Sequence, residues 1–315
     1  MISIQKTNFE NFNGNGVYIV PKNFIFSKIT LDIELEYVNK LVKDEKEFIH
    51  LNRYNQQIFI IVVPEKKTEW QNIEVLRKKG AEVCNSSNNL KLSEITIVDY
   101  SENASYGISV LEGLVLANYK FLKYFKDAEK KQNSLQRISY AGTVEDSVIR
   151  ECLNLWENVY VTKDLINEPV ISLPSHEFVA TIKQRSKDLG ISVTVREKSW
   201  LQDQGMGGIL AVNKGSIDNP YLLELVWKPE GASNVDPLIL VGKGVMYDSG
   251  GLSLKPTSGM ETMKADMSGA AAAFGTISAL AANKCNVYVV VLIPITDNRP
   301  GENACAPGDI IKMHN

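Results

Sequence analysis

Short β-branched apolar runs alternate with segments of helical apolar spacing along this chain. In its first part, residues 57–63 (QIFIIVV) and 94–99 (EITIVD) have the length and composition of strands. Apolar residues recur at helical spacing over 109–125, and the segment 66–80 between the two strands is predicted to be a helix that ends at Gly80. This half is therefore predicted to form a small α/β domain.

A polar, charged segment over residues 127–135 (DAEKKQNSL) is the predicted linker. A helix over about 143–166 is expected to follow it, because its apolar positions fall on one face. Pro169 ends this helix, since proline disfavours helical geometry in the residue before it. We therefore expect an N-terminal α/β domain over 1–135 and a second domain over 136–315, entered by this bridging helix.

The second domain alternates predicted strands with predicted helices. Strands are expected at 192–196, 221–227, 238–241 and 287–293, and helices around 201–205 and 267–282. Such alternation is typical of a mixed, largely parallel sheet flanked by helices. The predicted fold class is thus α/β with two domains.

Composition narrows the possible partners. A chain of 315 residues is long enough for two domains, and its formal net charge of -3 provides no basic field for nucleic acid or an anionic membrane. We find no signal peptide and no apolar run near the roughly 18 residues of a membrane span. The four cysteines are scattered without a CxxC pair, as in a cytoplasmic protein with reduced thiols. We expect a cytoplasmic protein that binds neither nucleic acid nor membrane.

The candidate chemistry lies in residues 238–273 (LILVGKGVMYDSGGLSLKPTSGMETMKADMSGAAAA). An apolar strand feeds into Gly242-Lys243-Gly244, which places Lys243 at the sheet edge where α/β proteins build their sites. Lys243 is either a surface lysine just past the strand or a desolvated amine whose pKa has fallen far enough for it to bind a metal.

Three further polar residues each have two interpretations. Asp248, in a Ser-Gly-Gly turn, is either a turn former or a ligand to a bound ion. Asp266 is either a helix N-cap or a ligand, and Lys255 is either a solvated loop charge or a cation aimed at a developing oxyanion. One amine and two carboxylates, with no histidine or thiolate nearby in sequence, would suit Mn²⁺, Mg²⁺ or Zn²⁺.

Other site classes lack their motifs. The three histidines do not cluster in sequence, and neither an HExxH motif nor a histidine-based hydrolase triad is indicated. The Gly-Lys-Gly sequence at 242–244 lacks the GxxxxGK[ST] order of a phosphate-binding loop, so nucleotide binding is not expected.

Residues 241–273 resemble the signature of the leucyl aminopeptidases, also called cytosol aminopeptidases, a family of dinuclear metallopeptidases. The shared features are VGKG, a DSGG-like turn, a KP pair and a GMETMKADM-like run. Segments 164–169 (DLINEP), 204–216 and 294–309 also match family segments, and 112–124 does so more weakly.

The resemblance implies roles for five residues. Lys243, Asp248 and Asp266 correspond to metal ligands, with Asp248 as the bridge between two divalent ions (Mn, Zn or Mg). Lys255 corresponds to the catalytic lysine that stabilises the gem-diolate, and Met263 to a wall of the substrate side-chain pocket. The implied reaction is attack of metal-activated water on a peptide whose free N-terminus is bound at the site.

The family's next motif, an NTDAEGRL-like segment with two more carboxylate ligands, would begin shortly after Asn315, where the sequence ends. We therefore expect an incomplete second metal position. The leading hypothesis is a metal-dependent aminopeptidase that releases leucine-like N-terminal residues from peptides, assembled as the family's homo-hexamer. The alternative is a catalytically impaired truncated or split homologue, which acts with a complementing C-terminal chain or as a scaffold.

Overall fold

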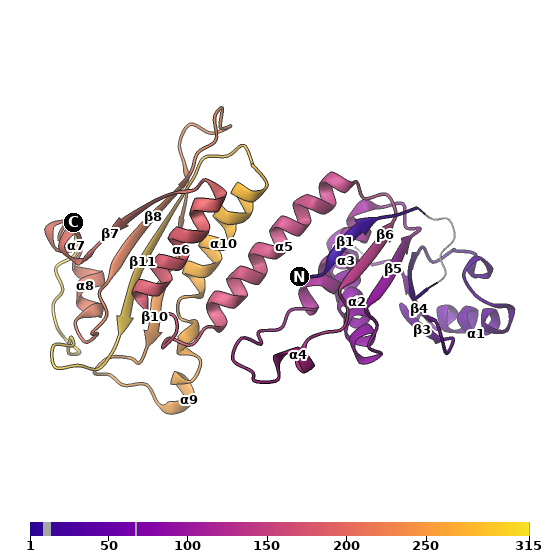
Figure 1. Cartoon of the computed structure of the whole chain (residues 1–315), viewed down its shortest axis with the longest axis horizontal. Coiled ribbons are helices and arrows are strands. Elements are labelled where there is room, and N and C mark those ends of the chain that lie inside the picture. Colours follow the sequence, from indigo (N-terminus) through magenta and orange to yellow (C-terminus); the bar gives the residue numbers. More distant parts are fainter. Residues whose placement is uncertain (9–13, 67, 315) are drawn as a thin grey trace. The chain divides into compact units, whose positions relative to one another are not determined.

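The structure is a computed structural model that describes residues 1–8, 14–66 and 68–314 (Figure 1). It contains two compact units, Met1–Trp156 and Glu157–Asn315. The division falls within the long helix α5 (Asp146–Asn167), which contributes residues to both units. The domain boundary expected at 135/136 remains a prediction. The division between the compact units lies inside a continuous helix, and such a position does not define where a domain begins.

The first unit is built on a six-stranded sheet of order β1-β6-β5-β2-β4-β3. Every neighbouring pair is parallel except β3 with β4. The strands are β1 (Ser3–Lys6), β2 (Gly16–Val20), β3 (Phe48–Asn52), β4 (Gln57–Val62), β5 (Glu94–Asp99) and β6 (Arg137–Ala141). The expected strands at 57–63 and 94–99 are β4 and β5.

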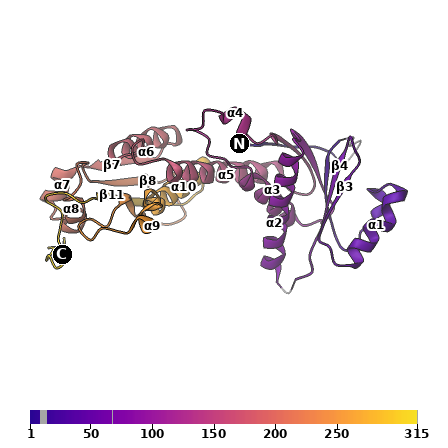
Figure 2. The same cartoon turned by 90° about the horizontal axis from the view of Figure 1, so that it is seen from below.

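Helices cover both faces of this sheet, so β4 is buried at all of its positions. α2 and α3 pack together on one face, and α1 lies on the other (Figure 2). The helical segments are η1 (Phe26–Lys28), α1 (Asp32–Lys43), α2 (Glu69–Asn89), α3 (Ala104–Ala117) and α4 (Ala128–Lys131).

Two predicted helices have different ends in the structure. The helix expected to end at Gly80 continues to Asn89, because Gly80 is the point where α3 approaches closely: a Cβ there would lie 2.2 Å from the carbonyl oxygen of Val110. The helix expected from residue 109 begins at Ala104, because the Asn103 side chain accepts a hydrogen bond from the Ser105 N–H and caps it.

The second unit contains a mixed sheet of order β10-β11-β8-β7, with β9 also paired to β11. β9 and β10 are parallel to β11, whereas β8 is antiparallel to both β11 and β7. The strands are β7 (Ser192–Arg196), β8 (Tyr221–Trp227), β9 (Leu238–Val241), β10 (Gly244–Asp248) and β11 (Val289–Asn298). The chain thus has the predicted α/β fold class.

β11 is the strand that brings the candidate residues together. Its first half pairs with β9, from Val289 opposite Leu238, and its second half pairs with β10, from Ile295 opposite Gly244. β9 and β10 therefore follow one another along the same edge of β11. The two residues between them are Gly242 and Lys243.

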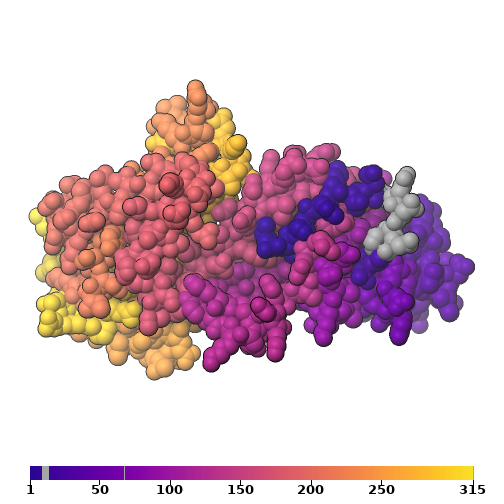
Figure 3. Space-filling view, viewed as in Figure 1, coloured from indigo at the N-terminus to yellow at the C-terminus, as the bar shows by residue number. Residues whose placement is uncertain are grey.

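Helices α6 and α10 pack against each other and against β11, with Phe178 and Phe274 fully buried in the core between helix and sheet. In the space-filling view, the chain around α6 forms much of this unit's surface on the face in view (Figure 3). Among the described helices, none has the length and apolar character to cross a membrane. The helical segments are α6 (Ser175–Leu189), α7 (Lys198–Asp203), α8 (Gly207–Asn213), α9 (Thr257–Met260), η2 (Met263–Ala265) and α10 (Ser268–Ala282).

Candidate active site

Asp248 ends β10 and is held by donors on both carboxylate oxygens. Oδ1 accepts hydrogen bonds from the Gly250 N–H at 2.9 Å and from Asn298 Nδ2 at 2.7 Å. Oδ2 accepts one from Lys255 Nζ at 2.5 Å. Burial raises the pKa of Asp248, but the hydrogen bonds from Lys255, Gly250 and Asn298 together outweigh it and leave the pKa below its ordinary value. The carboxylate is thus held ionised in a fixed orientation.

Lys243 and Asp266 form the second pair of predicted site residues. Lys243 Nζ lies 2.7 Å from Asp266 Oδ1, and the lysine side chain is 58% exposed whereas that of Asp266 is 18% exposed. Lys243 therefore lies just past its strand, as expected, and is an exposed, ion-paired amine in this structure. Asp266 is not the cap of α10, because Met267 precedes that helix and makes no side-chain capping bond.

The other carboxylate oxygen of Asp266, Oδ2, is buried and finds no hydrogen-bond donor among the described residues. A buried charged oxygen without a donor is costly, and such a group in a native protein calls for an explanation such as an ion. The unpartnered Asp266 Oδ2 is therefore consistent with a cation bound beside it.

The short helix η2 lies between the Lys255–Asp248 pair and the Lys243–Asp266 pair and adjoins both. Its first residue, Met263, places Sδ 3.2 Å from Lys255 Nζ, and Asp266 follows directly after its last residue. Lys264 Nζ donates to the carbonyl oxygen of Asn167 at 2.6 Å, which ties η2 to the end of α5 and to the DLINEP segment. The structure therefore brings all five predicted site residues to the surroundings of η2.

The donor set of these residues suits a hard divalent ion. Two carboxylates and an amine can hold one cation position, provided that Lys243 donates a lone pair instead of a proton. Within the described ranges, no three His, Cys, Asp or Glu side chains come together in an arrangement that could hold a metal ion. The residues present fit part of a metal centre.

Two polar residues at the end of β11, Asp297 and Asn298, also lie near the site and were not predicted from the sequence. Asn298 contacts Asp248 directly. Asp297 is 1% exposed, its pKa is raised by burial, and its Oδ1 has no hydrogen-bond partner in the described part of the chain. The available signal was topological, because the carboxyl ends of parallel strands meet at one edge of a sheet.

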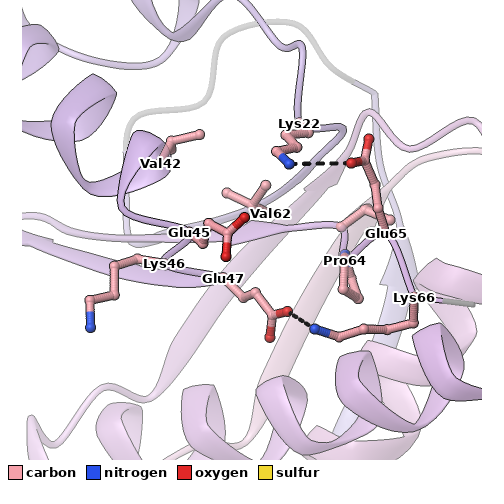
Figure 4. A pocket seen from close by; sticks show the side chains of 10 residues that line it. Lys22, Val42, Glu45, Lys46, Glu47, Val62, Pro64, Glu65 and Lys66 are labelled. Atoms are coloured by element: carbon pink, nitrogen blue, oxygen red, sulfur yellow. Dashed lines mark hydrogen bonds and ion pairs between the residues drawn. The ribbon is translucent and has the colours of Figure 1, made fainter.

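The first unit contains a charged pocket of about 360 Å³ (Figure 4). Two ion pairs border it: Lys22 Nζ lies 3.2 Å from Glu65 Oε2, and Lys66 Nζ lies 2.7 Å from Glu47 Oε1. The hydrogen bond that Lys66 donates to Glu47 raises the pKa of Lys66. Because these lysines and glutamates already neutralise one another, the pocket offers no charge of one sign for a ligand.

Comparison with known proteins gives sequence matches that are centred on the second half of the chain. Residues 160–315 match the cytosol aminopeptidase family, catalytic domain. A probable cytosol aminopeptidase of Phytoplasma australiense is 39% identical over 201 residues, which are 63% of this chain and 40% of the relative. The chain spans about half the length of the curated relatives it matches.

Two solved structures have a similar fold. A tomato leucine aminopeptidase mutant matches with a TM-score of 0.81 and 19% identity, over 100% of this chain and 66% of its own. A bottromycin maturation enzyme in complex with Mn matches with a TM-score of 0.79 and 24% identity, over 96% of this chain and 63% of its own. At these identities the similarity supports the fold alone.

Proposed function

Because this chain belongs to the cytosol aminopeptidase family, we propose that it acts as a metal-dependent aminopeptidase releasing leucine-like residues from peptides with a free N-terminus. The observation that carries the proposal is the arrangement around η2, where two lysine–carboxylate pairs meet and a buried Asp266 oxygen has no donor among the described residues. The alternative, a catalytically impaired truncated or split homologue that acts with a partner chain or as a scaffold, is not favoured, because all five residues of this chain to which the resemblance gives a role lie within the matched residues 160–315.

Lys243, Asp248 and Asp266 would hold the divalent ions in this proposal, with Asp248 as the shared ligand. When bound, the ions would supply Lewis-acid polarisation of the scissile carbonyl and a nucleophile derived from water. The manganese in the solved bottromycin maturation enzyme supports Mn²⁺ as the first ion to test. Lys243 must lose its proton and release Asp266 in order to become a ligand, so metal binding should release protons.

Lys255 would act on the substrate. Its side chain is 29% exposed, and its ammonium group, anchored by Asp248, can stabilise negative charge as it develops on the carbonyl oxygen. Met263, in contact with the same ammonium group, would form part of the wall for the substrate's first side chain. The name of the relatives, cytosol aminopeptidase, supports a cytoplasmic location. The family resemblance supports a homo-oligomer, for which the family hexamer is the specific proposal.

Release of the chromophore from a leucyl amide in the presence of Mn²⁺ tests this function. We expect turnover by the purified chain, and a loss of at least about 100-fold in kcat for Lys255→Ala, because removal of one stabilising donor typically costs 10² to 10³. Lys66→Ala, which removes a paired lysine of the first unit, is the control and should leave turnover unchanged. Equal turnover in Lys255→Ala and the parent protein would contradict the proposed role.

A further inference from the structure

We propose that Asn298 is the positioning residue that fixes the Asp248 carboxylate for metal binding, an inference that rests on the function proposed above. Asn298 is the last residue of β11 and Asp248 the last of β10, and the two are paired in register across the parallel strands. The side-chain amide of Asn298 donates from Nδ2 to Asp248 Oδ1 at 2.7 Å. The two strand ends are thus joined through the proposed ligand itself.

The main chain of Asn298 holds the residue that follows this ligand. Its carbonyl oxygen accepts hydrogen bonds from the Ser249 N–H at 2.9 Å and from Ser249 Oγ at 2.8 Å. Ser249 is only 4% exposed, so these bonds are shielded from water. Asn298 therefore fixes both the side chain of Asp248 and the backbone just beyond it.

The glycine turn leaves room for the amide of Asn298. A Cβ at Gly251 would lie 2.7 Å from Asn298 Oδ1, closer than non-bonded atoms approach, and Gly251 has a φ of +68°. Only a glycine therefore fits at this position without a shift of the turn or the amide. The absence of a side chain at Gly251 thus leaves the space that the Asn298 amide occupies.

The chemistry of an amide suits this role. Lys255 adds positive charge beside Asp248, whereas Asn298 donates a hydrogen bond without changing the net charge of the site. The two acceptor sites of Oδ1 are taken by Asn298 and the Gly250 N–H, so Oδ2, which accepts only from Lys255 among the described residues, is the oxygen left to face a cation. Loss of such an outer partner typically weakens metal binding by about 10- to 100-fold, because the ligand is no longer held in orientation.

The test compares Asn298→Ala with Asn234→Ala. Asn234 is also half-buried, and it makes hydrogen bonds near the opposite end of β11, with Asp236 and with the backbone of Tyr288. Mn²⁺ affinity is measured by calorimetry, the environment of bound Mn²⁺ by electron paramagnetic resonance, and stability by thermal unfolding without metal. We expect Asn298→Ala to weaken Mn²⁺ binding about 10- to 100-fold and to change the Mn²⁺ spectrum. Asn234→Ala should affect only thermal unfolding.

Two results would overturn the proposal, and a second variant covers the case in which Asn298→Ala does not fold. Mn²⁺ binding by Asn298→Ala within about twofold of the parent, against the expected 10- to 100-fold loss, overturns the positioning role and leaves the proposed function intact. A parent protein that binds no Mn²⁺ overturns the proposed function and the positioning role together. If Asn298→Ala does not fold, Asn298→Ser, which keeps a small polar side chain too short to reach Asp248, gives the same comparison with the same expected loss.

Discussion

Lysine–carboxylate pairs occur in both units of this protein, in very different surroundings. In the pocket of the first unit, Lys22 and Glu65 are 49% and 70% exposed, and the pair joins two long side chains. In the second unit, Asp248 is 20% exposed and is held by a backbone N–H and a side-chain amide as well as by its lysine. Solvent screening and side-chain entropy make pairs of the first kind weak.

The difference shows what distinguishes a candidate site from a charged hollow. A short carboxylate side chain held by several donors keeps its orientation when the paired lysine moves to bind something else. Among the described residues, the carboxylates of Glu47 and Glu65 each accept from a lysine and show no comparable anchoring by further donors. Fixed ligand geometry, and not pocket volume or the number of charges, therefore points to the second unit.

The largest expected effect is a loss of Mn²⁺ affinity when a carboxylate of the second unit, but not one of the first-unit pocket, is neutralised. Asp248→Asn should weaken Mn²⁺ binding by more than about 100-fold, because loss of a direct ligand should exceed the 10- to 100-fold cost of losing an outer partner. Glu47→Gln, which neutralises a carboxylate of the pocket, should leave the affinity unchanged. Calorimetric titration of both variants checks this, and similar affinities for the two would abolish the distinction.

An intermediate effect concerns the turn that follows Asp248. Gly251 and Gly231 both have positive φ, of +68° and +70°, but a Cβ at Gly231 would have nothing within 4 Å. Gly231→Ala should cost about 1 kcal/mol of unfolding free energy, from backbone conformation alone. Gly251→Ala should cost roughly 2 kcal/mol or more, because the new methyl group also collides with Asn298. Urea denaturation measures the unfolding free energy of both variants. Equal decreases would show that the turn accommodates the new methyl group at Gly251 without cost.

The smallest expected effect is on the pH dependence of stability, where Asp248 and Asp297 differ in sign. Because hydrogen bonds leave the pKa of Asp248 lowered in the fold, its contribution is complete above the unfolded pKa of about 3.9 and is lost as the pH falls through the lower folded value. Burial raises the pKa of Asp297, so ionisation of this group destabilises the fold at neutral pH, and that cost disappears as the pH falls through the raised value.

Thermal unfolding of the parent and two asparagine variants from pH 7 to pH 3 tests these signs. The parent should gain stability relative to Asp297→Asn as the pH decreases from neutral, and should lose stability relative to Asp248→Asn only below about pH 4. The same slope for both comparisons would mean that the two carboxylates do not have opposite environments.

Much of the fold could be predicted from the sequence, because most strands are short apolar runs with clear limits, even where the side chains are largely exposed, as in β9. The strands at 192–196, 221–227 and 238–241 have the predicted limits. Helix ends were less predictable, since Gly80 is a close contact between helices and not a terminus. The strand expected to end at residue 293 continues to Asn298, because its second half pairs with β10, a non-local interaction that its own sequence does not indicate.

The candidate site was predictable in its residues and less so in its geometry. Spacing and resemblance selected Lys243, Asp248, Lys255, Met263 and Asp266, but their assignment to a metal centre stays a prediction. Which lysine pairs with which aspartate depends on how β9, β10 and η2 pack, and the sequence does not contain that information in a local pattern. Asn298 was missed for the same reason, because a single asparagine acquires its role only from the strand beside it.

The interruption between β9 and β10 has a consequence for how this region can change. A Cβ at Gly242 would lie 2.7 Å from the Cα of Ala270, and the Ala270 N–H donates to the carbonyl oxygen of Lys243 at 3.0 Å. The first turn of α10 therefore packs against the backbone of Gly242 and Lys243, and this contact does not depend on the side chain of residue 243. The backbone framework can persist while that side chain is exchanged, so new chemistry could evolve at this position without rebuilding the sheet.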